Sequence, residues 1–395
     1  MAPVHTGDVV PGQWLVLLKP YSSASAKNTH LASVRAKTED TRTPFHCETH
    51  HEFDLLECRG YSAKFDLQTK DDIEKMDGVL SVEPVRLFRH CQRATQKNST
   101  WGLDRISHPK AVKPSGPYEY SYRSDAAGQG TTAYILDTGI NAEHSEFEGR
   151  ASRGQAFVTS DTKVSVGDTN GHGTHVAGTI GGKTFGVAKK VNIVSVKVFD
   201  DGRDPGARTD DIVRALQWVK TDARGKKAVV NMSLGGGYSE GLNAAVASLV
   251  RGGIIVCVAA GNETRIADSD SPASEPLAIT VGAIDKTDIL SEYSNYGRSA
   301  VMANGYNHNK VVDVLGPGTD ITSAWIGGND ATETISGTSM AQATPHVTGL
   351  VNCLLSDRTL QDPDPYGVMS QITIKADKNK ILGLDHVTSN SIIQV

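Results

Sequence analysis

The feature that most constrains the fold is a series of strands, apolar along their whole length, that alternate with helices from residue 101 onward. The expected strands are Thr132–Leu136, Val191–Phe199, Ala228–Leu234, Ile254–Ala260, Ala278–Ile284 and Val311–Val314. The expected helices are His172–Ile180, Asp211–Val219, Leu242–Val250 and Met340–Leu355. Strands of this kind are buried on both faces, and helical crossovers between them are typical of parallel sheets. We therefore predict an α/β domain with a central, mostly parallel sheet and helices on both faces.

A small α+β unit is predicted ahead of this domain, over residues 11–93, which leaves residues 94–395 for the α/β domain. Its expected strands are Trp14–Leu18, Asp54–Leu56, Tyr61–Leu67 and Val79–Val85. A short helix is expected over Thr69–Met76, with Thr69 as its cap. The polar, basic stretch Arg86–Thr100 is typical of an exposed connection.

Composition excludes several kinds of partner. The formal net charge is −5, and Lys and Arg are scattered along the chain, so we expect no nucleic-acid partner. No apolar run is long enough for a transmembrane helix, so we expect no membrane partner. We also expect a monomer. The first twenty residues lack the apolar region of a signal peptide. Either the protein stays inside the cell, or its true N-terminus precedes residue 1.

Three motifs fall where a parallel sheet gathers its functional side chains, at junctions between strands and helices. They are DTG with Asp137, NGHGTHVAG with His172, and SGTSMA with Ser339. A serine hydroxyl is a weak nucleophile until a base takes its proton, and histidine has a suitable pKa for that step. A buried carboxylate fixes the imidazole tautomer and stabilises the imidazolium. The three residue types together predict acyl-transfer chemistry.

Two further motifs suit the same reaction. AAGN places Asn262 at the end of an expected strand, where its amide can donate to an oxyanion. NMSLGG places glycines beside an expected strand, where an extended peptide could add as another strand.

Each motif has a simpler interpretation when it stands alone. Asp137 could form a turn, and Ser339 could cap a helix. His172 and His175 could form a metal pair, although no HExxH pattern or third ligand is evident. The order of the motifs, and their shared position at strand–helix junctions, favour the catalytic interpretation.

These motifs, with SPASEP, TVGAID and YSNYG, resemble the subtilisin-like serine peptidases, and the proteinase K branch in particular. The resemblance implies that Asp137 orients the base His172, that Ser339 is the nucleophile, and that Asn262 completes the oxyanion hole. It implies a secreted, broadly specific endopeptidase that favours apolar or aromatic residues before the scissile bond. The residues that would flank the specificity pocket are Ser233, Leu234, Gly235, Ala259, Ala260 and Gly261.

The resemblance extends to the N-terminal unit and to a metal. The stretch YSAKFDLQTKDDIEKMDGVLSVEPVRLF is similar to the family's inhibitory propeptide, which blocks the cleft until it is cut away. Cleavage would fall near Arg93–Ala94; the alternative is a permanent accessory domain. A structural Ca²⁺ is implied at the carbonyls of Pro276 and Ala278 and the carboxylate of Asp313, and no organic cofactor is implied.

Several features depart from the family pattern. Residues 298–309 are extra and directly precede the calcium region, and Gln342-Ala343 interrupts the serine helix. Two extra helical residues rotate the rest of the helix by about 200°. Pro205 falls in the expected edge strand Asp204–Arg208, and the family's disulfide cysteines are absent.

These observations leave three hypotheses. The first is an active, self-processed endopeptidase. The second is a catalytically impaired homologue that binds peptides, because of the insertion Gln342-Ala343. The third is an unrelated hydrolase such as an esterase, which the lack of a G-x-S-x-G motif around Ser339 disfavours.

Overall fold

The computed structural model describes residues 9–19, 23–40, 42, 44–55, 58–86, 93–113, 115–159, 165–201, 206–297, 311–338, 343–357, 360, 364–381, 384 and 388–395. The chain divides into two compact units, Met1–His90 and Cys91–Val395, and each is described by itself. The division lies three residues before the predicted domain boundary at residue 93. The roles assigned to the two units remain predictions.

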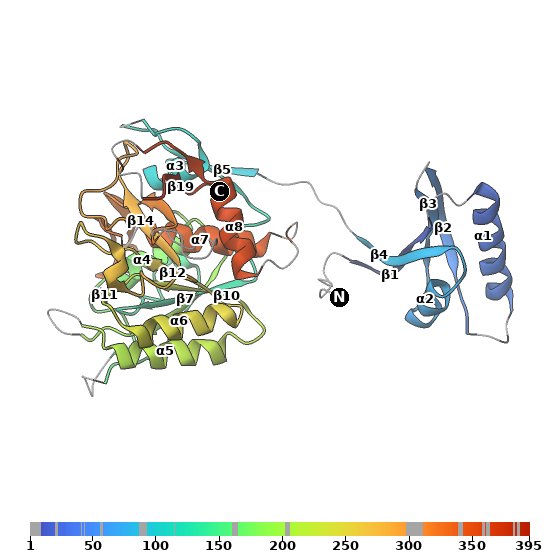
Figure 1. Cartoon of the computed structure of the whole chain (residues 1–395), viewed down its shortest axis with the longest axis horizontal. Helices are drawn as coiled ribbons and strands as arrows, with labels where there is room; N and C mark the ends of the chain where they lie inside the picture. Colours follow the sequence, from blue (N-terminus) through green and yellow to red (C-terminus); the bar gives the residue numbers. More distant parts are fainter. Residues whose placement is uncertain are drawn as a thin grey trace, which may run out of the picture. The chain divides into compact units, whose positions relative to one another are not determined.

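The small unit is a four-stranded antiparallel sheet with two helices (Figure 1). Its elements are β1 (Val9–Leu18), α1 (Ala24–Glu39), β2 (Glu48–Leu55), β3 (Cys58–Lys64), α2 (Leu67–Glu74) and β4 (Val79–Arg86), and the strand order is β2-β3-β1-β4. Leu31 of α1 and Ile73 of α2 join one apolar cluster with Val16 of β1 and Tyr61 of β3. Both helices therefore cover the same face of the sheet, as an α+β unit requires.

The helices of the small unit differ from the prediction. Helix α1 was not predicted, because most of its side chains are polar and only one side of the helix is buried. Helix α2 begins at Leu67, and the carboxylate of Asp66 caps it by accepting from the backbone N–H of Thr69 at 2.8 Å. The predictions of a strand continuing to Leu67 and of a Thr69 cap are therefore wrong. The helix begins directly after Asp66 because a carboxylate is a strong N-cap acceptor, and this start ends the strand before Leu67.

The large unit contains a nine-stranded sheet in which every neighbouring pair is parallel except β18–β19. In spatial order the strands are β18 (Asp377–Lys378), β19 (Ser391–Ile392), β15 (Val314–Pro317), β14 (Ile279–Ile284), β12 (Ile255–Ala259), β10 (Lys227–Met232), β7 (Thr131–Asp137), β9 (Asn192–Lys197) and β8 (Ala151–Ala156). The predicted fold class, an α/β domain with a mostly parallel central sheet, is confirmed.

Helices cover both faces of this sheet (Figure 1). They are α3 (Trp101–Ser107), α4 (His172–Gly181), α5 (Thr209–Asp222), α6 (Glu240–Arg251), α7 (Ala343–Ser356) and α8 (Pro365–Lys375), with 3-10 turns η2 (Ser145–Phe147) and η3 (Ala267–Ser269). Alternate residues of β7 point to opposite layers: Ile135 packs with α4 and α7, and Tyr134 packs with α5 and α6. The central strands are therefore buried on both faces.

Three short strand pairs complete the described part of the large unit. They are β5 (Arg93–Lys97) with β6 (Glu119–Arg123), β11 (Gly236–Gly237) with β13 (Asp270–Ser271), and β16 (Ile321–Ala324) with β17 (Thr332–Ile335). The prediction that Arg86–Thr100 is wholly a connection is wrong, because Arg93–Lys97 pairs antiparallel with Glu119–Arg123. The side chains of Arg93–Lys97 are polar apart from Ala94, so no hydrophobic alternation marks this segment as a strand. The strand expected at Val311–Val314 begins only at Val314.

Candidate active site

Asp137 is the last residue of the central strand β7. All seven residues of this strand are buried, and the aspartate side chain is fully enclosed. Its Oδ1 accepts from the backbone N–H of Thr138 at 2.7 Å. A carboxylate in such surroundings is stabilised only by the donors aimed at it.

His172 is the first residue of α4, and its ring reaches Asp137. The distance from Nδ1 of His172 to Oδ1 of Asp137 is 2.6 Å. Because a carboxylate oxygen accepts, Nδ1 carries the proton of this hydrogen bond. Two glycines allow the approach: Gly171 has φ of 107°, and a Cβ on Gly173 would lie 2.0 Å from the carbonyl oxygen of Gly139.

His175 lies in the core one turn along α4. Its Nε2–H donates to the carbonyl oxygen of Ile321 at 3.2 Å, and its ring meets Trp325 edge-on with 6.1 Å between centroids. Burial, and then the neighbouring His172, lower the pKa of His175 to about 3. The described residues hold no group of three or more His, Cys, Asp or Glu side chains arranged for a metal, so the metal-pair interpretation has no support there.

Asn262 follows β12 by three residues and is bound to the segment that leads to Ser339. Its Oδ1 accepts from the backbone N–H of Thr338 at 2.7 Å and from Oγ1 of Thr338 at 2.8 Å. Thr338 Oγ1 in turn accepts from the N–H of Gly261 at 3.0 Å. These bonds fix the oxygen end of the Asn262 amide against the residue that directly precedes Ser339.

Ser339 and the next three residues lie outside the described part of the chain, as do Pro205 and the extra residues 298–309. The predictions made for them therefore stay predictions. Helix α7 is described from Ala343, three residues after the predicted start of the serine helix.

The residues predicted to flank the specificity pocket follow two neighbouring strands, β10 and β12, at the same edge of the sheet as Asp137. Ser233 and Leu234 are buried, whereas Gly235 is exposed. Ala259 and Ala260 are buried, and Gly261 is half-buried. Apart from Leu234 these residues have small side chains or none, which leaves backbone open to the approach of an extended peptide.

Asn295 supports the loop that carries Asn262, and sequence reasoning missed it. Its Nδ2 donates to the carbonyl oxygen of Ala260 at 3.0 Å, and its Oδ1 accepts from the N–H of Glu263 at 2.9 Å. A Cβ on Gly261 would lie 2.2 Å from this Nδ2. The motif YSNYG carries part of the family resemblance, but nothing in its pattern indicates a contact with AAGN.

Asp168 was also missed, although its position two residues before NGHG is typical of an Asx turn. Its carboxylate accepts from the backbone N–H of Gly171 at 2.9 Å and from Oγ1 of Thr138 at 2.9 Å. It therefore contacts both segments that carry the Asp137–His172 pair.

Of the predicted calcium ligands, Asp313 has the clearest environment. Its Oδ2 accepts from the N–H of Thr280 at 2.8 Å, and burial raises its pKa to about 7. Ala278 is buried and Pro276 is exposed. A carboxylate removed from water in this way fits a cation ligand, because a bound cation would favour its charged form.

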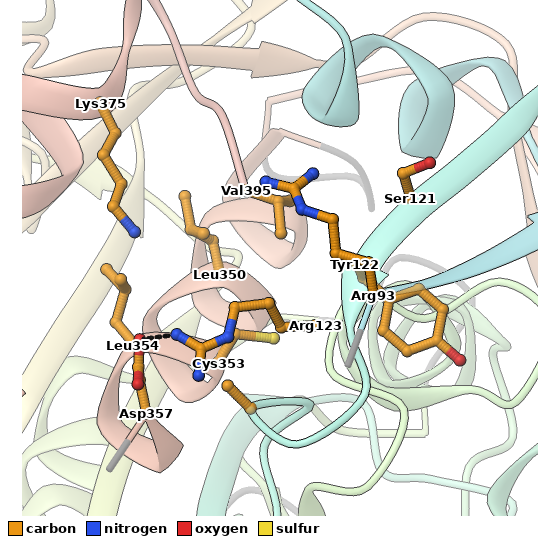
Figure 2. Close-up of a pocket in the computed structure, with 11 residues that line it drawn as sticks. Arg93, Ser121, Tyr122, Arg123, Leu350, Cys353, Leu354, Asp357, Lys375 and Val395 are labelled. Atoms are coloured by element: carbon orange, nitrogen blue, oxygen red, sulfur yellow. Dashed lines mark hydrogen bonds and ion pairs between the residues drawn. The ribbon is translucent and has the colours of Figure 1, made fainter. Parts of the chain in front are cut away.

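A separate cavity of about 100 Å³ lies between β6 and the helices α7 and α8 (Figure 2). An ion pair of 2.6 Å between Arg123 and Asp357 borders it. The other residues labelled in Figure 2 are Arg93, Ser121, Tyr122, Leu350, Cys353, Leu354, Lys375 and Val395. Because none of the motif residues lines it, this cavity does not belong to the candidate active site.

Comparisons with known proteins agree with this geometry. The subtilase family model matches residues 128–386. Alkaline protease 1 of Aspergillus clavatus is 40% identical over 372 residues, which are 91% of this chain and 86% of that protein. Subtilisin-like proteinase Mp1 of Magnaporthiopsis poae is 42% identical over 368 residues, 90% of this chain and 85% of that protein. A cold-adapted subtilisin-like serine proteinase of known structure is 37% identical, with a TM-score of 0.64 over 75% of this chain and 98% of that chain.

The chain therefore belongs to the subtilase family. It is a serine endopeptidase of the subtilisin type, and proteins or peptides are its substrates. Within its described residues, none of the helices has the length and apolar character that a membrane crossing needs.

Proposed function

We propose that peptide hydrolysis proceeds through a triad of Asp137, His172 and Ser339. The observation that carries this proposal is the 2.6 Å contact between Nδ1 of His172 and Oδ1 of Asp137. In the proposed mechanism Nε2 of His172 takes the hydroxyl proton of Ser339 as its Oγ attacks the scissile carbonyl, and then gives that proton to the leaving amine. A water molecule then attacks the acyl-enzyme: His172 takes a proton from this water and returns a proton to Oγ of Ser339 as the acyl group leaves.

Asn262 is the proposed side-chain donor to the oxyanion. The bonds from Thr338 hold the oxygen of this amide, which directs its –NH₂ group away from Thr338. Such a donor lowers the barrier by on the order of 3 kcal/mol. Replacing Asn262 with Ala should therefore lower kcat on the order of 100-fold while KM changes little.

Labelling with a fluorophosphonate tests the triad directly. The full chain should label once, and Ser339→Ala should abolish labelling, because the probe reacts only with an activated serine hydroxyl. Ser248→Ala removes an exposed hydroxyl on α6 and is the matched control, which should label like the wild type. Labelling that persists in Ser339→Ala would contradict the assignment of the nucleophile.

The impaired-homologue hypothesis is an outcome of the same experiment. The identity to alkaline proteases over most of the chain favours the active enzyme. A folded chain that binds peptides, never labels and never cuts itself would instead favour impairment. Deletion of Gln342-Ala343 should restore labelling in that case alone.

We infer that the small unit is a propeptide that inhibits the protease and is removed by self-cleavage near Arg93–Ala94. Its similarity to family propeptides supports this inference. Cleavage there would leave Ala94 as the first residue of β5, which pairs with β6 in the large unit. N-terminal sequencing of protein from culture medium should find Ala94 or a neighbour, and should also test secretion. The Ser339→Ala chain should stay whole.

Specificity is proposed to be broad, with a preference for apolar or aromatic residues before the scissile bond. The alanine and glycine residues at the end of β12, Ala259, Ala260 and Gly261, support this proposal, because their small side chains leave room for a large substrate side chain. A peptide library that varies this position should show cleavage after several apolar residues, and strict selection of a charged residue would contradict it.

A structural Ca²⁺ is proposed at Asp313, with the carbonyls of Pro276 and Ala278. The ion would neutralise the buried carboxylate and stabilise the fold by mass action. Tm should rise with Ca²⁺ relative to chelator in the wild type, and Asp313→Asn should remove most of that rise. An unchanged rise in Asp313→Asn would place the ion elsewhere.

A further inference from the structure

We propose that Asp168 is a positioning residue that holds His172 against Asp137. The proposal rests on the catalytic roles proposed above for those two residues. Asp168 lies in the loop before α4, four residues ahead of His172, and is half-buried.

The carboxylate of Asp168 accepts five hydrogen bonds from two segments of the chain. Its Oδ1 accepts from Oγ1 of Thr138 at 2.9 Å, from the N–H of Asn170 at 3.0 Å and from the N–H of Gly171 at 2.9 Å. Its Oδ2 accepts from Thr174, at 2.9 Å from the backbone N–H and 2.6 Å from Oγ1. One side chain therefore joins the residue after Asp137 to the first turn of α4.

Thr138 completes this bridge on the other side of His172. Its Oγ1 donates to Asp168 and accepts from the N–H of Gly173 at 3.0 Å. The backbone N–H groups on both sides of His172, those of Gly171 and Gly173, are thus bonded to the pair Asp168 and Thr138. The position of His172 along the helix axis depends on these bonds.

A second carboxylate anchors the same loop. Asp201 accepts from Oγ1 of Thr169 at 2.5 Å and pairs with Nζ of Lys197 at 2.9 Å. Lys197 is 1% exposed, and its Nζ also donates to the carbonyl oxygen of Thr138. The polar contacts therefore form a closed ring through Thr138, Asp168, Thr169, Asp201 and Lys197, and Thr138 in this ring directly follows Asp137.

Loss of the Asp168 carboxylate should affect catalysis in two ways. An amide at residue 168 has one acceptor oxygen and an –NH₂ group, so it cannot accept from both Thr138 and Thr174. The loss loosens the first turn of α4, and misplacement of a catalytic group by about 1 Å costs on the order of 100-fold in rate. The change also removes a negative charge four residues before His172, so we expect the pKa of His172 to fall in Asp168→Asn.

Kinetics of Asp168→Asn test the positioning role in the full chain, with active centres counted by fluorophosphonate. We expect kcat per active centre to fall about 10- to 100-fold with KM within about twofold, and the acid limb of kcat/KM to move to lower pH. Asp285→Asn is the matched control, because Asp285 also accepts three bonds within a loop, from Thr287 and Ile289. It should match the wild type. Wild-type kcat and an unmoved acid limb in Asp168→Asn would overturn the proposal.

Thr138 provides a second pair of variants that keeps the test valid if Asp168→Asn misfolds. Thr138→Val has nearly the same shape but cannot donate to Asp168, whereas Thr138→Ser keeps the hydroxyl. We expect Thr138→Val to lower kcat, and Thr138→Ser to keep most of the wild-type kcat. The double variant Thr138→Val/Asp168→Asn should lose little more kcat than either single variant, because both changes disrupt the same contact between residues 138 and 168. Equal activity of the Val and Ser variants would overturn the proposal.

A measurement without turnover separates this proposal from the proposed function. In a Ser339→Ala chain with labelled histidine, NMR reports the pKa of His172 and its Nδ1–H resonance whether or not the wild type hydrolyses peptides. Asp168→Asn should lower that pKa and weaken the resonance, and Asp285→Asn should change neither. An unchanged His172 resonance and pKa would overturn the positioning role even in an active protease.

Discussion

The two units of the chain bury their sheets differently. The sheet of the small unit is covered by α1 and α2 on one face, and its strand β2 is largely exposed. The sheet of the large unit is covered on both faces, and every residue of β7 is buried. A unit with one covered face buries a smaller share of its surface, so burial of its core contributes less to its free energy of unfolding.

Buried charge separates the two units as well. In the large unit Arg105 is fully buried between Asp288 and Asp377, and Lys197 is almost fully buried. In the small unit the ion pairs reach the surface: Lys27 is nearly buried, but its partners Glu52 and Asp54 are more than a third exposed. The small unit therefore depends chiefly on apolar packing, while the large unit also depends on ion pairs whose members are all nearly buried, such as Arg105 with Asp288 and Asp377.

The largest expected effect is on chemistry in the large unit. Asp137→Asn should lower kcat on the order of 10⁴-fold, because an amide favours the wrong tautomer of His172. Steady-state kinetics with counted active centres measure this effect. A loss of less than tenfold would mean that the Asp137–His172 contact is not used in catalysis.

The next effect is on the stability of the large unit. Arg105→Met leaves two carboxylates buried without their cation, and should lower the free energy of unfolding by about 3–5 kcal/mol. Arg208→Met breaks an exposed pair of 2.9 Å with Asp210, which solvent screens, and should leave the free energy of unfolding nearly unchanged. Denaturant unfolding measures both changes, and equal costs would contradict the role given to buried charge.

A smaller effect is expected on the core of the small unit. Leu31 is 3% exposed, and Leu31→Ala should destabilise this unit by about 3 kcal/mol. Leu67 is 70% exposed, so Leu67→Ala should cost less than about 0.5 kcal/mol. Hydrogen exchange should show the Leu31→Ala change in amides of residues 9–86 only. Faster exchange in β7 or β10 would show that the substitution also destabilises the large unit, and would contradict this prediction.

A more gradual effect, spread over several pH units, is a pH slope that arises at His175. Burial lowers its pKa from 6.5 to about 3, so below pH 6.5 the unfolded chain binds a proton that the folded chain does not. The free energy of unfolding should therefore fall as pH drops from 6.5 toward 3. Its contribution is about 1.4 kcal/mol per pH unit.

His175→Gln should flatten this slope, whereas replacement of the exposed His50 by Gln should leave it unchanged. Acid titration of the unfolding midpoint measures the slope. An unchanged slope in His175→Gln would show that other groups carry the acid sensitivity.

Much of the large unit could be predicted because its strands are apolar on both faces and its functional residues follow those strands. The contact of Asp137 with His172 was foreseeable from the ends of β7 and α4. Helix α1 and strand β5 were not, because their side chains are mostly polar and their pairing partners lie elsewhere in the chain. Asp168 and Asn295 were missed for a related reason: each acts through hydrogen bonds to loops that only the fold brings together.

The proposed triad is tested most directly by the distance from Nε2 of His172 to Oγ of Ser339 in a crystal structure of the self-processed protein. Proton transfer between these atoms requires about 2.6–3.2 Å, with Asp137 still bonded to Nδ1. We predict a separation in that range. A hydroxyl that points away from the imidazole, or lies well beyond hydrogen-bonding reach of it, would contradict the proposed triad.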